Sequence, residues 1–131
     1  MHSLGYTPAM SKISKTATLY LKFLNLVRAL DDAPTFPALD ATEERLLGEL
    51  ANAWAEDRRV TVLEAMSLET DVSATTIHRR LKSLRKKGVV SLEVDEADNR
   101  IKYVLPTPLA GEYFAALSRC MMAATKSARS A

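Results

Sequence analysis

Residues 73–88 read SATTIHRRLKSLRKKG and predict an amphipathic helix whose two faces differ sharply in chemistry. Ile77, Leu81 and Leu84 recur at i, i+4 and i+7, so they form one apolar stripe on a helix with 3.6 residues per turn. A stripe of this kind must pack against a core. The opposite face carries the polar side chains Thr75, Arg79, Lys82 and Lys86.

Both ends of this helix have favourable capping residues. The Ser73 hydroxyl can accept a hydrogen bond from a free N–H of the first turn, and Gly88 suits the C′ position. We therefore expect the helix to run from about residue 74 to residue 87.

Basic charge is concentrated on this helix. Residues 75–87 hold six Lys or Arg and no acid, although the formal net charge of the whole chain is only +2. Residues 39–71 carry nine acids against three bases, and residues 72–102 carry eight bases against four acids. When the basic residues of a near-neutral protein are concentrated on one helix, that helix is typical of a surface that binds a polyanion. A basic face on a single helix is nevertheless more often simply solvated.

A short helix over residues 61–70 precedes the basic helix. We expect it to present Leu63 and Met66 inward, and only Asp71 and Val72 separate it from the basic helix. Two short helices joined by a tight turn form a helix-turn-helix. Asp71 tolerates the left-handed backbone that such a turn uses better than most residues do.

Two further helices are predicted before this motif. We expect a flexible arm over residues 1–15, a helix over about 15–30, and a linker over 31–38 that contains two prolines. The next helix begins after Asp40, with Glu43 in capping-box spacing, and ends near residue 57. Its predicted buried side chains are Leu46, Leu47, Leu50 and Trp54.

After Gly88 the period of the apolar residues changes from 3.6 to 2. Val90, Leu92 and Val94 alternate with polar residues, and Ile101, Tyr103 and Leu105 share one face of a second run, which predicts a β-hairpin. Thr107 then caps a last helix, with Pro108 at its first position and an apolar stripe of Leu109, Tyr113, Leu117 and Met121. We expect this helix to end at about residue 124, before a flexible tail over 125–131.

Length and composition fit one globular domain, predicted over residues 16–124. The chain has 131 residues, of which 47% are hydrophobic, and a single cysteine, Cys120. One cysteine excludes an intrachain disulfide and agrees with a reducing compartment, so we expect a cytoplasmic protein. The apolar region 19–30 is interrupted by Lys22 and Arg28, and it predicts neither a membrane span nor a signal peptide.

The order of these elements resembles the MarR-type winged-helix transcription regulators over about residues 16–124. The stretch VSATTIHRRLKSLRKKGVV is similar to the recognition helix of that family and its exit into the wing. Asp98, Asn99 and Arg100 match the wing tip, and YVLPTPLAGEYF resembles the passage into the last helix. The resemblance implies a mainly α protein with a small β-hairpin (α+β), a winged helix-turn-helix with N- and C-terminal dimerisation helices. It also implies a homodimer that regulates transcription, usually as a repressor.

Double-stranded DNA is the partner that the residues themselves favour. The major groove accepts one α-helix, and Arg79 is our first choice for a base contact because Arg pairs well with guanine. We expect base-edge contacts from the front of the helix, by Thr75, Thr76, His78, Arg79 and Lys82. We expect phosphate contacts, which add affinity without reading sequence, from Ser73, Arg80, Arg85, Lys86, Lys87 and Lys102.

The hairpin tip is expected to reach the adjacent minor groove. Arg100 would enter the groove, with Asp98 orienting it and Asn99 beside it. An alternative for Arg100 is a simple ion pair within the hairpin, with Asp98 or Glu96, and His78 is equally well explained as a half-exposed polar residue.

The terminal helices carry more apolar surface than one small core can cover, which predicts a dimer interface. In the resembling family the terminal helices of two subunits interleave and place two recognition helices on a palindrome. The alternative is that these helices cover each other within one subunit. The predicted interface residues are Leu19, Phe23, Leu26, Leu30, Tyr113, Phe114, Leu117 and Met121.

Other functions have weaker support in the sequence. We find no metal-ligand spacing, phosphate loop or nucleophile elbow, and we therefore expect no enzyme, no metal and no cofactor. A winged helix that binds only protein, and a DNA-binding accessory factor in replication or plasmid maintenance, remain alternatives. Members of the resembling family often bind a small-molecule effector, and for Cys120, on an apolar helix, an inert thiol is favoured over a redox role.

Overall fold

The computed structural model describes residues 13–68 and 72–130, with side chains described as far as residue 126. The chain forms two compact units. One spans Thr35–Phe114, and the other comprises helix α2 (Lys15–Asp31) and the part of helix α6 (Pro108–Ser130) that follows Phe114. Most of the predicted arm, residues 1–12, lies outside the described residues.

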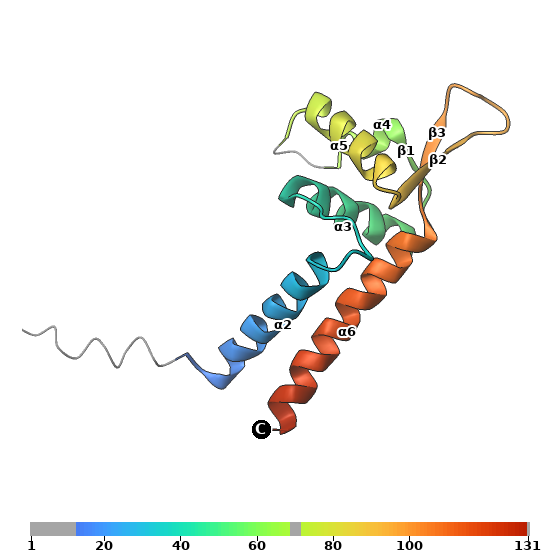
Figure 1. Ribbon diagram of the computed structural model, residues 1–131. Helices are drawn as coiled ribbons and strands as arrows, with labels where there is room; N and C mark the ends of the chain where they lie inside the picture. Colours follow the sequence, from blue (N-terminus) through green and yellow to red (C-terminus); the bar gives the residue numbers. More distant parts are fainter. Residues whose placement is uncertain (1–12, 69–71, 131) are drawn as a thin grey trace, which may run out of the picture. The chain divides into compact units, whose positions relative to one another are not determined.

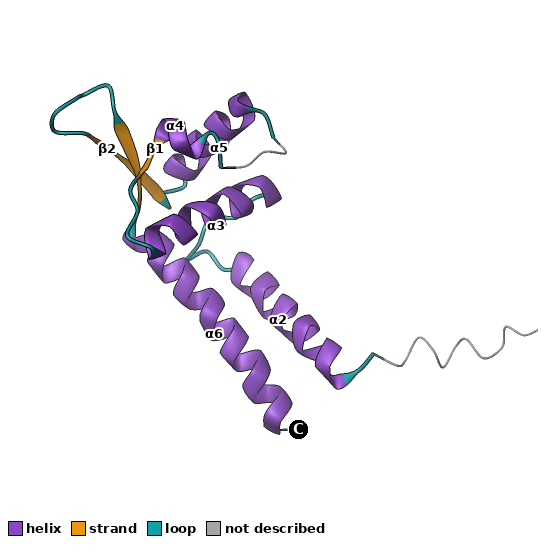
Figure 2. Cartoon of the chain, turned by 180° about the vertical axis from the view of Figure 1, so that it is seen from behind, coloured by secondary structure: helices purple, strands orange, loops and turns teal. Residues whose placement is uncertain are grey.

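The larger unit contains a small antiparallel sheet in strand order β1-β3-β2 together with three helices and the start of α6 (Figure 1). Figure 2 shows the sheet at one end of this unit, with the β2–β3 loop projecting from it. In chain order the elements are α3 (Ala41–Ala55), β1 (Val60–Thr61), α4 (Val62–Ala65), α5 (Ala74–Lys86), β2 (Val90–Val94) and β3 (Lys102–Pro106).

The predicted helix starts are confirmed by their caps. The Asp40 carboxylate accepts from the Glu43 N–H at 2.8 Å, and the Glu43 carboxylate accepts from the Asp40 N–H at 2.9 Å, which completes the capping box of α3. The Ser73 hydroxyl oxygen accepts from the Thr76 N–H at 3.2 Å at the start of α5. These side chains satisfy N–H groups that the helix itself leaves without partners.

The core lies where α3 and α5 meet the sheet. Ile77, Leu81 and Leu84 are buried on α5, as the apolar stripe predicts. Leu46, Leu47 and Leu50 are buried on α3, and Trp54 is half-buried, with its indole N–H donating to the Val104 carbonyl at 3.0 Å. The α5 stripe therefore has the core partner that it requires.

The predicted hairpin is present, but the buried face of its second strand differs from the alternation that we expected. Leu92 pairs with Val104, and Val104 is fully buried, whereas Ile101 is exposed and Tyr103 and Leu105 are half-buried. The reason is that β3 is the central strand, so Val104 also has Val60 of β1 as a neighbour. The sequence did not reveal β1, because two residues are too few to show an alternation.

The α4 segment is shorter than predicted, and one of its expected inward residues points outward. Ala65 is buried, Met66 is half-buried, and Leu63 is 77% exposed. A capping box between Thr61 and Glu64 starts the helix at Val62 and sets this rotation. The predicted turn at Asp71 lies outside the described residues.

The exit from α5 is joined to the start of α6. Gly88 has a φ of +84°, a left-handed conformation in which a side chain would be strained, and the N–H of Val89 donates to the Leu84 carbonyl. The Thr107 hydroxyl donates to the Gly88 carbonyl and accepts from the N–H of Ala110. Thr107 thus caps α6, as predicted, and α6 continues to Ser130 rather than ending near residue 124.

In the smaller unit, α2 starts at the predicted place but has no buried residue. The Ser14 hydroxyl oxygen accepts from the N–H of Ala17 and caps this helix. Tyr20, Leu21 and Leu26 are exposed, and so are Met121 and Met122 on α6. One chain therefore leaves much apolar surface of this unit uncovered.

Leu50 on α3 and Leu63 on α4 give a direct test of which side chains form the core. We expect Leu50→Ala to lower the free energy of unfolding by about 2–5 kcal/mol, because Leu50 is fully buried and truncation leaves a cavity. We expect Leu63→Ala to change it by less than about 0.5 kcal/mol, because this side chain already faces solvent. Urea denaturation of the two variants measures both values, and equal losses would contradict the described rotation of α4.

Candidate nucleic-acid interface

The exposed face of α5 carries the side chains that the sequence predicts for base contact. Thr75, His78, Arg79 and Lys82 are exposed, and Thr76 is half-buried. They lie opposite Ile77, Leu81 and Leu84, whose burial fixes the rotation of the helix. The major groove of DNA is wide enough to admit one α-helix, so this exposed face could contact base edges there.

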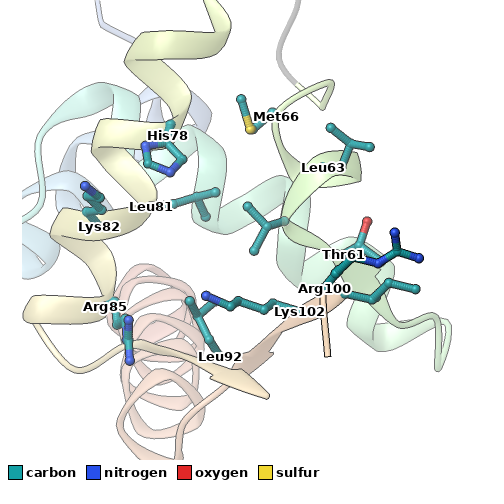
Figure 3. Close-up of a pocket in the computed structure, with 12 residues that line it drawn as sticks. Thr61, Leu63, Met66, His78, Leu81, Lys82, Arg85, Leu92, Arg100 and Lys102 are labelled. Carbon is teal, nitrogen blue, oxygen red and sulfur yellow. The ribbon is translucent and has the colours of Figure 1, made fainter. Parts of the chain in front are cut away.

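A groove of about 770 Å³ separates α5 from α4 and the hairpin (Figure 3). Figure 3 shows His78, Lys82 and Arg85 on the α5 side, with Arg100, Lys102 and Leu63 across from them. Apart from Thr61, the described residues that line the groove are basic or apolar, and none is acidic. The basic ones are His78, Lys82, Arg85, Arg100 and Lys102, and the apolar ones are Val62, Leu63, Met66, Leu81, Leu92 and Ile101.

The hairpin tip is organised around Asp98 and Arg100. The Arg100 guanidinium donates to both carboxylate oxygens of Asp98, from Nε at 3.0 Å and from Nη2 at 3.0 Å, and the Arg100 backbone N–H donates to the same carboxylate. This hydrogen bonding lowers the pKa of Asp98 and raises the pKa of Arg100. The Arg100 side chain is nevertheless 86% exposed, so the ion pair and outward presentation occur together.

A second carboxylate, Asp95, ties the tip to the body of the hairpin. It accepts from the backbone N–H groups of Ala97 and Asp98 and from the Tyr103 hydroxyl at 2.9 Å. The bond from Tyr103, followed by the two backbone bonds, lowers the pKa of Asp95, and the same contact raises the pKa of Tyr103. The guanidinium of Arg59 lies 3.7 Å from the centre of the Tyr103 ring. Arg59 could not be singled out from the sequence, because it precedes a strand that is too short to show an alternation.

Two of the predicted phosphate ligands are engaged elsewhere in this structure. Arg80 Nη1 lies 3.1 Å from Asp40 Oδ2, and Lys87 Nζ lies 2.7 Å from Glu43 Oε1. Lys87 also donates to the carbonyl of Ala38 at 2.7 Å. Both cations therefore face α3, and sequence reasoning missed this because the pairing joins residues about 40 positions apart.

The remaining predicted phosphate ligands are variously placed. Arg85, Lys86 and Lys102 are exposed, and Arg85 and Lys102 line the groove. The Ser73 hydroxyl donates to the Thr76 hydroxyl at 3.0 Å in addition to its capping bond. Asn99 is exposed beside Arg100.

The predicted interface residues divide into two groups. Leu26 and Met121 are exposed, and five are half-buried, namely Leu19, Phe23, Leu30, Phe114 and Leu117. Tyr113 is buried within the larger unit, where its ring meets Phe36 edge to face at 5.6 Å between centroids. Tyr113 thus belongs to the core of one chain and leaves little surface for a partner.

The described residues contain no cluster of three or more His, Cys, Asp or Glu side chains that could hold a metal ion. Cys120 is a free, half-buried thiol on α6. Within the described part of the chain, no helix is long and apolar enough to cross a membrane.

The ion pair at Glu43 predicts a pH dependence of stability. Burial raises the pKa of this carboxyl, but the hydrogen bonds from Lys87, Ser83 and the Asp40 backbone, with the charge of Lys87, outweigh burial, and the net pKa is lowered. A lowered folded-state pKa stabilises the folded chain fully above the ordinary glutamate pKa, and the effect is lost as pH falls through the lowered value. We expect the acid-induced loss of unfolding free energy in urea to be smaller in Glu43→Gln than in the wild type.

Glu49→Gln is the matched control, because Glu49 is an exposed glutamate on the same helix. An identical acid response in Glu43→Gln and the wild type would show that the Glu43 pair does not contribute.

Comparison with known proteins locates the fold among transcriptional regulators. No model of a protein family matches the chain, and no curated protein matches it. Transcriptional regulator Tm0710 from Thermotoga maritima superposes with a TM-score of 0.59 at 16% identity, over 86% of this chain and 71% of that one.

Two other solved structures give the same result. A point mutant of MepR from S. aureus superposes with a TM-score of 0.61 at 15% identity, over 99% of this chain and 84% of that one. BpsR from Bordetella bronchiseptica, whose DNA binding is regulated by 6-hydroxynicotinic acid, gives 0.51 at 17% identity, over 85% and 78%. The chain therefore has the winged helix-turn-helix fold of MarR-type transcriptional regulators.

Proposed function

We propose that this protein is a sequence-specific DNA-binding transcriptional regulator, acting in the cytoplasm as a homodimeric repressor on a palindromic operator. The observation that carries the proposal is the outer face of α5. Arg79, Lys82 and Lys86 are exposed there, and the helix contains no acid. Such a face matches the shape and charge of a DNA major groove.

The hairpin supports the same assignment. Arg100 is held by Asp98 in one orientation while most of its side chain remains exposed. Preorganisation lowers the entropy that would be lost when the side chain is fixed on binding. Asp95 and Tyr103 restrain the loop that carries Arg100, so the hairpin can present this cation to a narrow minor groove beside the α5 site.

The distribution of charge favours DNA over a protein partner. The groove between α5 and the hairpin joins the two predicted contact regions with four Lys or Arg side chains and no acidic one among its described residues. A winged helix that binds only protein has no need of such a surface. DNA binding and protein binding can be distinguished by their salt dependence. A protein that binds DNA releases counterions from the phosphates, so its affinity falls steeply as the salt concentration rises.

Uncovered apolar side chains support the dimer. Leu26 is 37% exposed on α2, which has no buried residue, and Met121 is 58% exposed on α6. Exposed apolar surface of this kind marks interaction sites in soluble proteins. A second copy of the chain would cover it and would supply the second recognition helix that a palindrome requires.

Arg79 and Lys86 provide a matched test of the DNA contacts. We expect Arg79→Ala to weaken binding to the selected site by about 1–3 kcal/mol and to relax its base preference. We expect Lys86→Ala to weaken all sequences alike and to lower the slope of log affinity against log salt by about one. Fluorescence anisotropy with labelled duplexes over a series of salt concentrations measures both effects.

The wild type is the reference, and Glu49→Ala is a control away from the proposed interface. Unchanged affinity and unchanged salt slope in both α5 variants would show that this face does not contact DNA. Salt-insensitive binding by the wild type would instead favour the protein-binding winged helix.

The dimer is tested by placing charge on the uncovered apolar surface. We expect Leu26→Asp combined with Met121→Asp to give a monomer in sedimentation velocity, because two carboxylates would be buried unpaired in the interface. Val94→Asp, which changes an exposed apolar residue of β2, is expected to remain dimeric. A dimer that persists in the double variant would move the interface elsewhere.

A further inference from the structure

Arg80 of α5 and Lys87 at its C-cap take no part in the outer face of the helix, because they contact the first turn of α3. Arg80 pairs with Asp40 at 3.1 Å and Lys87 pairs with Glu43 at 2.7 Å. Asp40 and Glu43 are also the two partners of the α3 capping box. We call these four residues the α3–α5 clamp.

The clamp holds α5 at two points, the middle of the helix and its C-terminal end. Arg80 and Lys87 are seven residues apart, which is almost two helical turns, so they project from the same side of the helix. Each one meets a carboxylate that is already held by the backbone of α3. Two fixed points on one side of a helix restrict its rotation about its own axis and its shift along that axis further than burial of the apolar stripe does.

Stability alone does not explain the Glu43 pair. The Glu43 side chain is 1% exposed, so its carboxylate has lost its hydration, and the hydrogen bonds that it accepts must offset that loss. Apolar residues of similar volume are often as stable as a buried ion pair. A buried pair does impose direction, because Lys87 Nζ must meet both Glu43 Oε1 and the carbonyl of Ala38 at 2.7 Å.

We propose that the α3–α5 clamp positions the recognition helix for base reading, and that Glu43, Lys87 and Arg80 are positioning residues rather than phosphate ligands. This inference rests on the proposed DNA-binding function. The clamp holds one flank of α5 against α3, while His78 and Arg85, on the other flank, line the groove toward the hairpin. Arg79 and Lys82 are thereby presented between the two flanks at a fixed angle.

Adjacent lysines allow positioning to be separated from phosphate contact. Lys86 is exposed and Lys87 is clamped, so Lys86→Met is the matched control for a variant that removes the Lys87 pair. The test variant is Glu43→Gln/Lys87→Met, which removes both charges and leaves no unpaired carboxylate in the interior. Affinity is measured by anisotropy for the selected site and for a random duplex, each over a series of salt concentrations.

For Lys86→Met we expect the salt slope to fall by about one, with the ratio of specific to random affinity unchanged. For Glu43→Gln/Lys87→Met we expect an unchanged salt slope and about a tenfold fall in that ratio, which is the size of losing one base pair of recognition. Arg80→Gln removes the other arm of the clamp at a half-exposed site and is expected to act in the same direction. It provides the test if the double variant does not fold.

The contrary results are distinct. A fall of about one in the salt slope of the clamp variants would make Lys87 and Arg80 phosphate ligands and overturn the inference alone. Unchanged slope and unchanged ratio would show that the clamp does not position α5 and would also overturn it. A wild type that binds no DNA at low salt would overturn the proposed function and this inference together.

Discussion

Burial of one stripe of α5 is the constraint on which the rest of the site depends. Ile77, Leu81 and Leu84 pack into the core beside α3 and the sheet, so the opposite face of the helix must meet solvent or a partner. The free energy of burying this apolar stripe thereby sets the direction in which the Arg and Lys side chains of the opposite face point. The clamp then refines this orientation from one flank, where charged groups meet at hydrogen-bond distance.

The hairpin is held differently, because its tip consists mainly of polar and charged residues and its loop projects from the sheet. Hydrogen bonds replace packing there. Asp95 holds two backbone N–H groups and the Tyr103 hydroxyl, and Asp98 holds Arg100. The two carboxylates therefore order the loop through hydrogen bonds rather than through apolar burial. The Arg100 side chain stays largely exposed, as an electrostatic contact with a phosphate-lined groove requires.

Features that local chemistry determines could be predicted from the sequence. The caps at Ser73, Asp40 and Thr107 and the α5 stripe follow from spacing along the chain, and the structure has them. Features set by distant residues were missed. Strand β1 is defined only by its pairing with β3, Leu63 faces outward because a capping box sets the start of α4, and Arg80 and Lys87 are engaged by carboxylates of another helix.

The most direct test of the account is selection of bound duplexes from a randomised DNA pool by the purified protein, followed by sequencing. We expect enrichment of an inverted repeat whose half-sites lie one helical turn, roughly 34 Å, apart, because two copies of α5 would occupy successive major grooves. Recovery of DNA without an enriched sequence, or failure to recover DNA at low salt, would contradict the claim that the outer face of α5 reads bases.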